Sequence, residues 1–168
     1  NHDQIGNRAL GERLPALAPP EATRAVEAVY LLLPQIPMLF MGEEWGSTQP
    51  FPFFCDFGGE LGEAVSAGRL REFARFAAFT DPGQRARIPD PGDEATFRLA
   101  SLDWSVAESW HGKAMRMRYE ALLALRHRCI VPLLPHITRA ADWNVAADGA
   151  IDIRWRTTQG TWLRLLAN

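Results

Sequence analysis

A short, uninterrupted apolar run, Met38-Leu39-Phe40-Met41, is the feature of the sequence that most constrains its fold. Pro37 precedes the run and Gly42 follows it, so its length suits a strand better than a helix. A strand without alternating polar residues is typical of a parallel sheet, which is covered on both faces. We therefore expect a buried strand of an α/β fold at this position.

A helix is predicted directly before this strand, which gives the helix–turn–strand order of α/β proteins. It opens at Pro19-Pro20-Glu21, and Pro34 ends it. Its apolar residues recur at helical spacing and predict one buried face, made of Ala22, Ala25, Val26, Val29 and Leu33. Two further helices are predicted, from about Glu63 to Phe79 and from about Trp110 to His127. The last of them carries the apolar stripe Trp110, Ala114, Met117, Ala121 and Leu125.

The pattern changes near the C-terminal end, where apolar and charged residues alternate. Ile151, Ile153 and Trp155 are separated by single charged residues, the period of a strand with one buried face. Thr158-Gln159-Gly160 can reverse the chain, and residues 161–167 can form the returning strand. We expect an antiparallel hairpin here, and we divide the chain into an α/β part, residues 1–130, and a β part, residues 131–168.

The composition excludes several classes of partner. The 168 residues suffice for about one domain, and 47% of them are hydrophobic, which is ordinary for a soluble protein. A formal net charge of −2 gives no electrostatic reason to expect nucleic acid as a partner. Glu27, Gln35 and two prolines interrupt the most apolar stretch, so no membrane span is expected. The two cysteines lack zinc-site spacing and favour reduced thiols in a cytoplasmic protein.

The densest polar cluster runs from Asn1 to Arg8, where we expect a loop that follows a strand. Asn, Asp and Gly are also the residues of ordinary turns, and this interpretation stays open. A metal-binding His–Asp pair is disfavoured, so no metal site is predicted, because the remaining histidines lack ligand spacing: His111, His127 and His136. The third interpretation is a carboxylate, Asp3, that stabilises an oxocarbenium-like transition state, with His2 bound to a sugar hydroxyl.

Two motifs resemble conserved regions of the α-amylase family of glycoside hydrolases. Asn1-His2-Asp3 is similar to the region at the end of the seventh strand of that family's (β/α)8 barrel, and residues 36–44 are similar to its eighth-strand segment. A wider match narrows the resemblance to the malto-oligosyltrehalose trehalohydrolases: Asn1–Leu14, Met41–Gly46, Gly68–Phe73 and Ser101–Trp104. The resemblance covers nearly the whole chain.

The resemblance implies roles for individual residues. Asp3 matches the family's transition-state-stabilising aspartate, and His2 matches the histidine that binds the sugar in the cleavage subsite. Gln4 and Glu44 follow the two strand positions and are expected to reach the cleft, since barrel sites lie at the C-terminal ends of strands. Three aromatic residues are candidates for stacking on glucose rings, and alternatively pack under a long loop: Trp45, Phe53 and Phe54.

The resemblance also implies a fold and a reaction. Residues 1–130 would be the C-terminal part of a (β/α)8 TIM barrel, and residues 131–168 the beginning of an all-β C-terminal domain. The reaction would be retaining hydrolysis of the α-1,4 bond next to the terminal trehalose of malto-oligosyltrehalose, with release of trehalose and without a cofactor. The family's nucleophile and general acid belong to strands four and five, so they are expected upstream of Asn1. We therefore expect a C-terminal fragment, inactive by itself, of an enzyme that binds malto-oligosyltrehalose or a related α-glucan.

Three alternatives stay open. One is another α-amylase-family enzyme such as a glucan branching enzyme, although these typically follow the His–Asp pair with Glu and apolar residues rather than with Gln4-Ile5-Gly6-Asn7. Another is a non-catalytic carbohydrate-binding fragment, in which the aromatic loop and the hairpin would bind maltodextrin. The last is a gene remnant without function.

Overall fold

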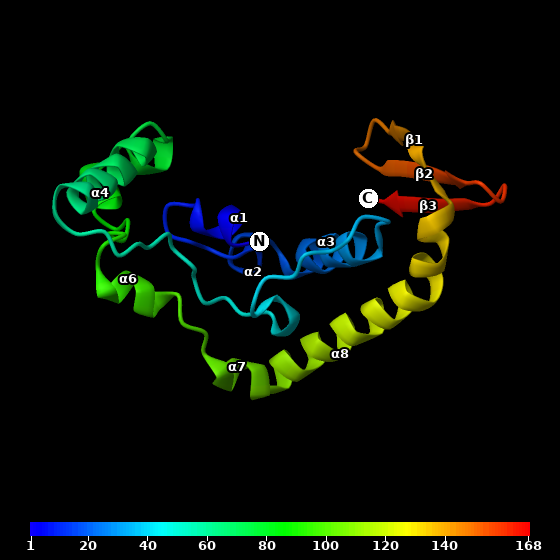
Figure 1. Ribbon diagram of the computed structural model, residues 1–168, viewed down its shortest axis with the longest axis horizontal. Coiled ribbons are helices and arrows are strands. Elements are labelled where there is room, and N and C mark those ends of the chain that lie inside the picture. The colour runs from blue at the N-terminus through cyan, green and yellow to red at the C-terminus, as the bar shows by residue number, and fades with distance from the viewer. The chain divides into compact units, whose positions relative to one another are not determined.

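The computed structural model describes residues 1–168, apart from the side chain of residue 139, and it combines helices with one sheet (Figure 1). The α-helices are α1 (His2–Gly6), α2 (Leu14–Leu17), α3 (Pro20–Leu32), α4 (Gly59–Phe73), α5 (Pro82–Arg85), α6 (Glu94–Leu99), α7 (Trp104–Glu108) and α8 (Trp110–Leu125). Short 3₁₀ or π segments are η1 (Glu43–Trp45), η2 (Ala77–Phe79), η3 (Arg126–Ile130) and η4 (Val131–His136). The strands are β1 (Ile137–Val145), β2 (Ile151–Thr157) and β3 (Trp162–Ala167).

The chain forms two compact units, each of which has its own internal packing. The first unit comprises residues 1–18 and 39–113, and the second comprises residues 19–38 and 114–168. In the first unit, Phe73 of α4 packs with Ala9 and Ile88 in a small buried cluster, and Leu10 and Phe79 lie against it. The first unit also contains every residue that the sequence proposes for the site.

Residues 2–6 form a helix, so the predicted loop at this position is wrong. The side chain of Asn1 accepts a hydrogen bond from the backbone N–H of Asp3 at 2.9 Å. Gln4 completes a capping box by bonding back to the backbone of Asn1. The polar residues that favour turns are also those that cap helices, because both structures need a side chain to pair with free backbone groups.

The predicted buried strand at Met38–Met41 is also wrong, because these residues belong to no strand. Met38 is 64% exposed, and Leu39 and Met41 are exposed as well. The three described strands form one sheet in the order β1-β2-β3, and none of them pairs with this segment. An apolar run predicts which side chains avoid water, but a strand forms only where a neighbouring backbone offers hydrogen bonds.

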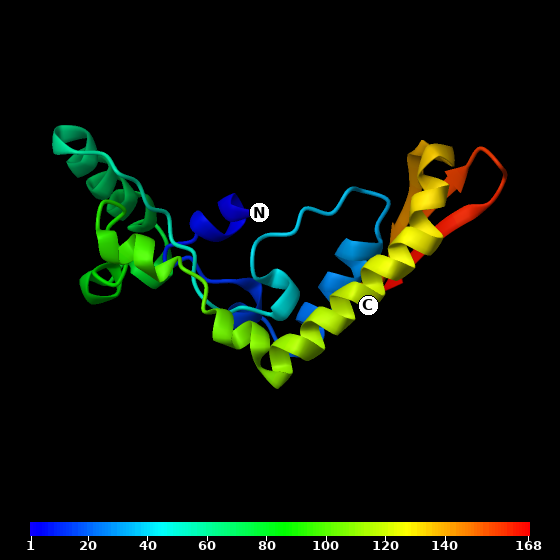
Figure 2. The same ribbon diagram turned by 60° about the horizontal axis from the view of Figure 1, so that its bottom comes forward.

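Helix α3 has the predicted ends, but the predicted buried face is wrong. Its buried residues are Thr23, Glu27 and Leu31, whereas Val26 of the predicted stripe is exposed. A guanidinium group from farther along the chain stabilises the C-terminal end of this helix. Arg126 donates to the carbonyl oxygens of Leu31, at 3.1 Å, and of Gln35, at 2.8 Å. Figures 1 and 2 show α3 beside the later part of α8 in both views.

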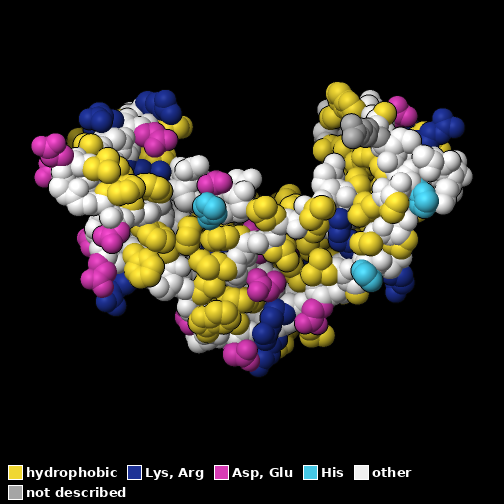
Figure 3. Space-filling model, in the orientation of Figure 1, with side chains coloured by type: hydrophobic (Ala, Val, Ile, Leu, Met, Phe, Trp, Pro, Cys, Tyr) yellow, Lys and Arg dark blue, Asp and Glu magenta, His cyan; other side chains and the backbone are white. Residues whose placement is uncertain are grey.

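Helix α8 begins at the predicted residue and continues at its end into the π segment η3. Its predicted apolar stripe is not the buried face, since Trp110 is 85% exposed, whereas Tyr119 is buried. Figure 3 shows such hydrophobic side chains on the visible surface of both units. None of the helices in the described part of the chain has the length and apolarity that crossing a membrane requires.

Helix α4 starts and ends earlier than predicted. After Phe73 the backbone continues through tighter i→i+3 bonds, from the Phe76 N–H to the Phe73 carbonyl and from the Phe79 N–H to the Phe76 carbonyl. The predicted helix therefore breaks into α4 and η2. Asp81 caps the short helix α5 by accepting from the backbone N–H of Gln84 at 2.9 Å.

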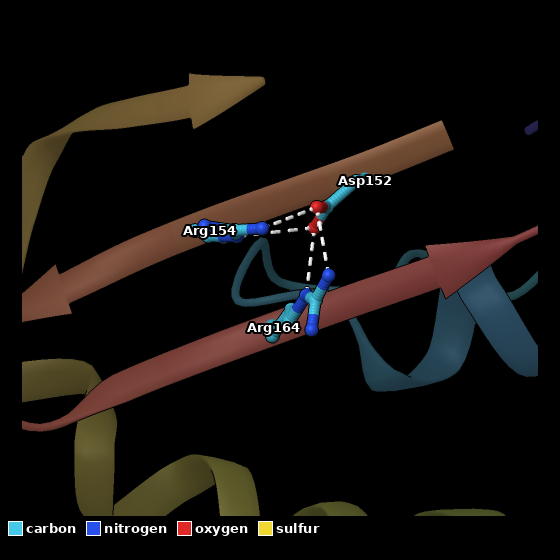
Figure 4. A network of polar contacts seen from close by, with 3 residues as sticks. All are labelled: Asp152, Arg154 and Arg164. Carbon is cyan, nitrogen blue, oxygen red and sulfur yellow. Dashed lines mark hydrogen bonds and ion pairs between the residues drawn. The ribbon is translucent and has the colours of Figure 1, made fainter. Parts of the chain in front are cut away.

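The predicted hairpin is confirmed in the second unit. Strands β2 and β3 pair antiparallel, with Trp155 opposite Leu163 and Ile151 opposite Ala167. A third strand, β1, which the sequence pattern did not indicate, pairs on the other side of β2 and carries a bulge after Ile137. On one face of the sheet, Asp152 accepts hydrogen bonds from Arg154 at 2.7 Å and from Arg164 at 2.9 Å (Figure 4).

Candidate active site

His2 and Asp3 form the accessible polar pair of the candidate site. The imidazole Nε2 of His2 lies 3.1 Å from a carboxylate oxygen of Asp3, and each of the two side chains is 66% exposed. Both residues lie in the first turn of α1, which the cap by Asn1 fixes in place. A ligand can therefore reach the carboxylate and the imidazole together, and the charge of the carboxylate is free to act on that ligand.

The structure brings the two motifs of the sequence into contact. The ring of His2 lies 6.4 Å from the ring of Phe40, which belongs to the second motif. The backbone N–H of Phe40 in turn donates to the carboxylate of Glu43 at 3.0 Å. Residues about forty positions apart in sequence thus lie close together in the fold.

Glu44 and Trp45 lie on the single turn η1, between Gly42 and Gly46. Both glycines have a left-handed backbone, with φ of 87° and 70°, which side-chain-bearing residues rarely adopt. Glu44 is half-buried. Trp45 is only 4% exposed and its ring lies 5.0 Å from that of Trp104, which is the geometry of a packing residue. Of the two alternatives for Trp45, packing under the loop therefore fits the structure better than stacking on sugar.

Phe53 and Phe54 differ in how much of each ring is available. Phe54 is half-buried and lies between two other rings in edge-to-face contacts, with Phe51 at 5.7 Å and Phe97 at 5.3 Å. Phe53 is exposed, and its described ring partner is a guanidinium, that of Arg69. Phe53 is therefore the better placed of the two for contact with a sugar face.

Gln4 has a local structural role. It belongs to the capping box of α1, in which its side chain accepts a hydrogen bond from the backbone of Asn1. The side chain is exposed, so it lies on the same accessible turn as His2 and Asp3. Its assignment to sugar binding stays a prediction.

Arg13 is a structural residue of the site that sequence analysis missed. It is almost fully buried and donates to the carbonyl oxygens of Gln49 at 2.5 Å and Met41 at 2.7 Å. Burial lowers the pKa of Arg13, and the nearby charges of Glu43 and Glu44 oppose that shift. Arg13 thus ties together the two ends of the loop that carries Glu44, although an arginine in a polar sequence gives no signal of such burial.

Arg69 is the second missed residue. It is buried on α4, and it donates to the backbone carbonyls of Gly6, the last residue of α1, and of Arg8, just after that helix. Burial lowers the pKa of Arg69, and the charge of Glu72 opposes that shift. The motif Gly68–Phe73 contains this residue, but its role is visible only in three dimensions.

The chemistry of the described residues is that of charge stabilisation. One accessible carboxylate beside an imidazole can stabilise a developing positive charge and bind a hydroxyl group. Among the described side chains, His, Cys, Asp and Glu form no group of three that could hold a metal ion.

A comparison with solved structures shows which class of protein this chain resembles. No family model matches the chain. A crystal structure of a Salmonella typhimurium protein provisionally assigned as an alpha amylase matches all of the chain, with a TM-score of 0.87 and 44% sequence identity, and the match covers 28% of that protein. The chain therefore has a mixed helix-and-sheet fold that resembles part of an alpha amylase structure.

Relatives in sequence then indicate a particular group of enzymes within that class. The chain is 42% identical over 168 residues to the malto-oligosyltrehalose trehalohydrolase of Deinococcus radiodurans, over 99% of this chain and 26% of that protein. It is 46% identical over 127 residues to the enzyme of the same name from Arthrobacter ramosus, over 75% of this chain and 21% of that protein. The resemblance to malto-oligosyltrehalose trehalohydrolases is thereby confirmed, and the chain spans about a quarter of the length of these relatives.

Proposed function

We propose that the chain is part of a retaining glycosidase that cleaves the α-1,4 bond next to the terminal trehalose of malto-oligosyltrehalose and releases trehalose. The observation that carries this proposal is the 42% identity over 168 residues to an enzyme named for that reaction. The accessible His2–Asp3 pair supports it, because an exposed carboxylate can approach a sugar ring. The substrate of the whole protein is accordingly malto-oligosyltrehalose or a related α-glucan.

We propose further that residues 1–130 complete a (β/α)8 barrel and that residues 131–168 begin an all-β domain. The likeness to an alpha amylase structure and the antiparallel sheet of residues 137–167 support this division. The exposed apolar side chains of Met38, Leu39 and Met41 also support it, because apolar side chains that face water here would find packing partners in a complete barrel.

In the proposed mechanism, Asp3 acts as a carboxylate that stabilises positive charge at the anomeric carbon as the glycosidic bond breaks. His2 donates a hydrogen bond to a hydroxyl of the sugar in the cleavage subsite. Phe53 offers its exposed ring to a glucose face, and Phe54 supports that loop from beneath. Gln4 and Glu44 contribute polar contacts at the edge of the same surface.

A retaining reaction needs two further carboxylates, one as nucleophile and one as general acid. The resemblance assigns them to strands four and five of the barrel, which precede the motifs of this chain in family order. Asp3 would therefore neither attack the sugar nor transfer a proton. Its contribution would be confined to the transition state.

Product analysis of the full-length protein tests the proposal. We expect free trehalose to appear when the protein is incubated with malto-oligosyltrehalose, and we expect reducing ends to appear more slowly with plain maltodextrin. New α-1,6 branches in place of free trehalose would favour the branching enzyme alternative. Binding of maltodextrin without any product would favour the non-catalytic alternative.

A further inference from the structure

Arg69 connects α4 to the C-terminal end of α1, the helix that carries His2 and Asp3, and to the backbone that follows it. The side chain is 8% exposed, and its Nη2 donates to two carbonyl oxygens, those of Gly6 and Arg8, each at 2.7 Å. Gly6 is the last residue of α1, where helical carbonyls lack partners within the helix and need an external donor. Arg69 therefore serves as the donor at the end of the helix that carries Asp3.

The same stretch of backbone lies directly against the aromatic loop. The N–H of Phe51 donates to the carbonyl of Gly11 at 2.8 Å. A methyl group on Gly11 would lie 2.3 Å from the nitrogen of Pro52, so the two backbones approach too closely for any side chain at this position. Any shift of residues 6–11 is therefore transmitted to residues 51–53.

The guanidinium of Arg69 also contacts the aromatic loop itself. Its central carbon lies 5.5 Å from the ring centroid of Phe53 and 4.7 Å from that of Phe73, which is within cation–π range. The guanidinium of Arg69 thus contacts the ring of Phe53 in the loop and the ring of Phe73 in its own helix. At the same time its Nη2 donates to the C-terminal end of α1. Lysine cannot reproduce this arrangement, because its ammonium is a compact point charge without the planar, forked guanidinium.

We propose that Arg69 is a positioning residue that fixes Asp3 and Phe53 relative to each other. It makes no contact with substrate in this arrangement. It sets the distance between the carboxylate that stabilises the transition state and the ring that receives a sugar. The proposal rests on the function proposed above, since Asp3 and Phe53 have these roles only in a glycosidase.

Kinetics of the full-length protein test the proposal through Arg69→Lys. A displacement of Asp3 by about 1 Å is expected to lower kcat by up to about 10²-fold, because catalysis depends steeply on alignment. Arg71→Lys is the matched control, since Arg71 lies on the same helix with its side chain exposed. We expect the control to keep kcat and KM of the unchanged protein.

A double-variant comparison separates positioning from general damage. If Arg69 acts through Asp3, adding Arg69→Lys to an Asp3→Asn protein lowers kcat by no more than about 3-fold. A full multiplicative loss in the Asp3→Asn background would overturn the proposal, as would a kcat of Arg69→Lys within about 3-fold of the unchanged protein. If Arg69→Lys does not fold, Arg69→Met takes its place, because it keeps the apolar stem against Phe73 without burying a charge.

Amide hydrogen exchange tests the same contact without any substrate. In Arg69→Lys or Arg69→Met, the amides of residues 7–11 and Phe51 are expected to exchange about 10-fold faster, whereas those of α8 keep their rates. Unchanged exchange at residues 7–11 would overturn the proposal. If the unchanged full-length protein releases no trehalose, the proposed function fails, and the exchange rates alone then decide whether Arg69 holds α1.

Discussion

The carboxylate of Asp3 is exposed and lies 3.1 Å from the imidazole of His2, so a sugar ring can reach it without displacing a packed side chain. Asp3→Asn keeps the shape of the side chain and removes its charge. We expect kcat of the full-length protein to fall by about 10²–10³-fold with the thermal unfolding temperature unchanged, because the lost interaction operates mainly in the transition state.

Steady-state kinetics with malto-oligosyltrehalose measure this effect. Asp142→Asn is the matched control, since the same substitution then falls on an exposed residue of strand β1. A kcat of Asp3→Asn within a few-fold of the control would remove Asp3 from the proposed mechanism.

Trp45 offers a second test at the scale of one residue, because its two assignments predict different measurements. The ring packs against Trp104, and its indole N–H has no hydrogen-bond partner among the described residues. If Trp45 packs under the loop, Trp45→Ala destabilises the protein by about 3–5 kcal/mol, and Trp45→Phe costs less, since it loses less volume and removes an unpaired donor. Urea unfolding of both variants measures these costs. A raised KM at unchanged stability would instead assign Trp45 to sugar stacking.

At the scale of the element, the sheet of the second unit carries a charge network that predicts a pH dependence. Hydrogen bonds from Arg164 and Arg154 hold the pKa of Asp152 well below its ordinary value (Figure 4). A carboxyl group with a lower pKa in the folded state stabilises the fold at pH values above its unfolded pKa, about 3.9 for Asp. That contribution is lost progressively as the pH falls below this value and through the folded pKa.

We therefore expect Asp152→Asn to lower the unfolding temperature by a constant, small amount between pH 7 and about 5, and by a shrinking amount below about pH 4. Thermal unfolding followed by circular dichroism at several pH values measures the difference. Added salt is expected to reduce this difference in unfolding temperature, since both arginines of the network are exposed. A difference that grows toward acid pH would contradict the assignment.

The elements also show what the sequence can and cannot predict. Helix α3 was placed correctly because Pro20 and Pro34 act locally on the backbone, and the β2–β3 hairpin because its turn and alternation are local as well. The buried face of α3 was not predicted, since its partners lie about ninety residues later in the chain: Arg118 pairs with Glu27, and Arg126 donates to the carbonyl of Leu31. The strand at Met38–Met41 failed for the same reason, because a strand depends on neighbours that local pattern does not contain.

In the candidate site, too, the sequence predicts what local residues determine and does not predict what depends on residues far away in the chain. The His2–Asp3 pair was recognised because it and residues 36–44, in this order and at this separation, resemble two motifs of a known family. Arg13 and Arg69 were not recognised as structural residues, because their carbonyl partners lie up to 63 positions away in sequence. A charged residue in sequence indicates exposure by default, and only the fold reveals one whose charge is enclosed by backbone carbonyls.

At the scale of the whole molecule, residues 1–168 leave apolar side chains exposed in both units, including Val26 of α3, Met38 and Trp110 of α8. Single exposed apolar residues are ordinary, but here they fall on the stripes and on the run that sequence analysis assigned to a core. The chain also spans about a quarter of the length of its relatives. In the glycosidase proposed above, these side chains would pack against the rest of the protein.

This leads to a prediction for residues 1–168 expressed alone: they release no trehalose from malto-oligosyltrehalose under conditions in which the full-length protein does. Retaining hydrolysis needs a nucleophile and an acid about 5–5.5 Å apart across the scissile bond, and the resemblance assigns both to earlier strands. Asp3 by itself can stabilise a charge but cannot form or break the glycosidic bond.

Chromatography of the products after long incubation measures the outcome, and the full-length Asp3→Asn protein sets the level of residual activity for comparison. Trehalose release by the isolated segment above that level would mean that the nucleophile and the acid lie within these 168 residues, and the assignment of Asp3 as a purely electrostatic group would then have to be abandoned.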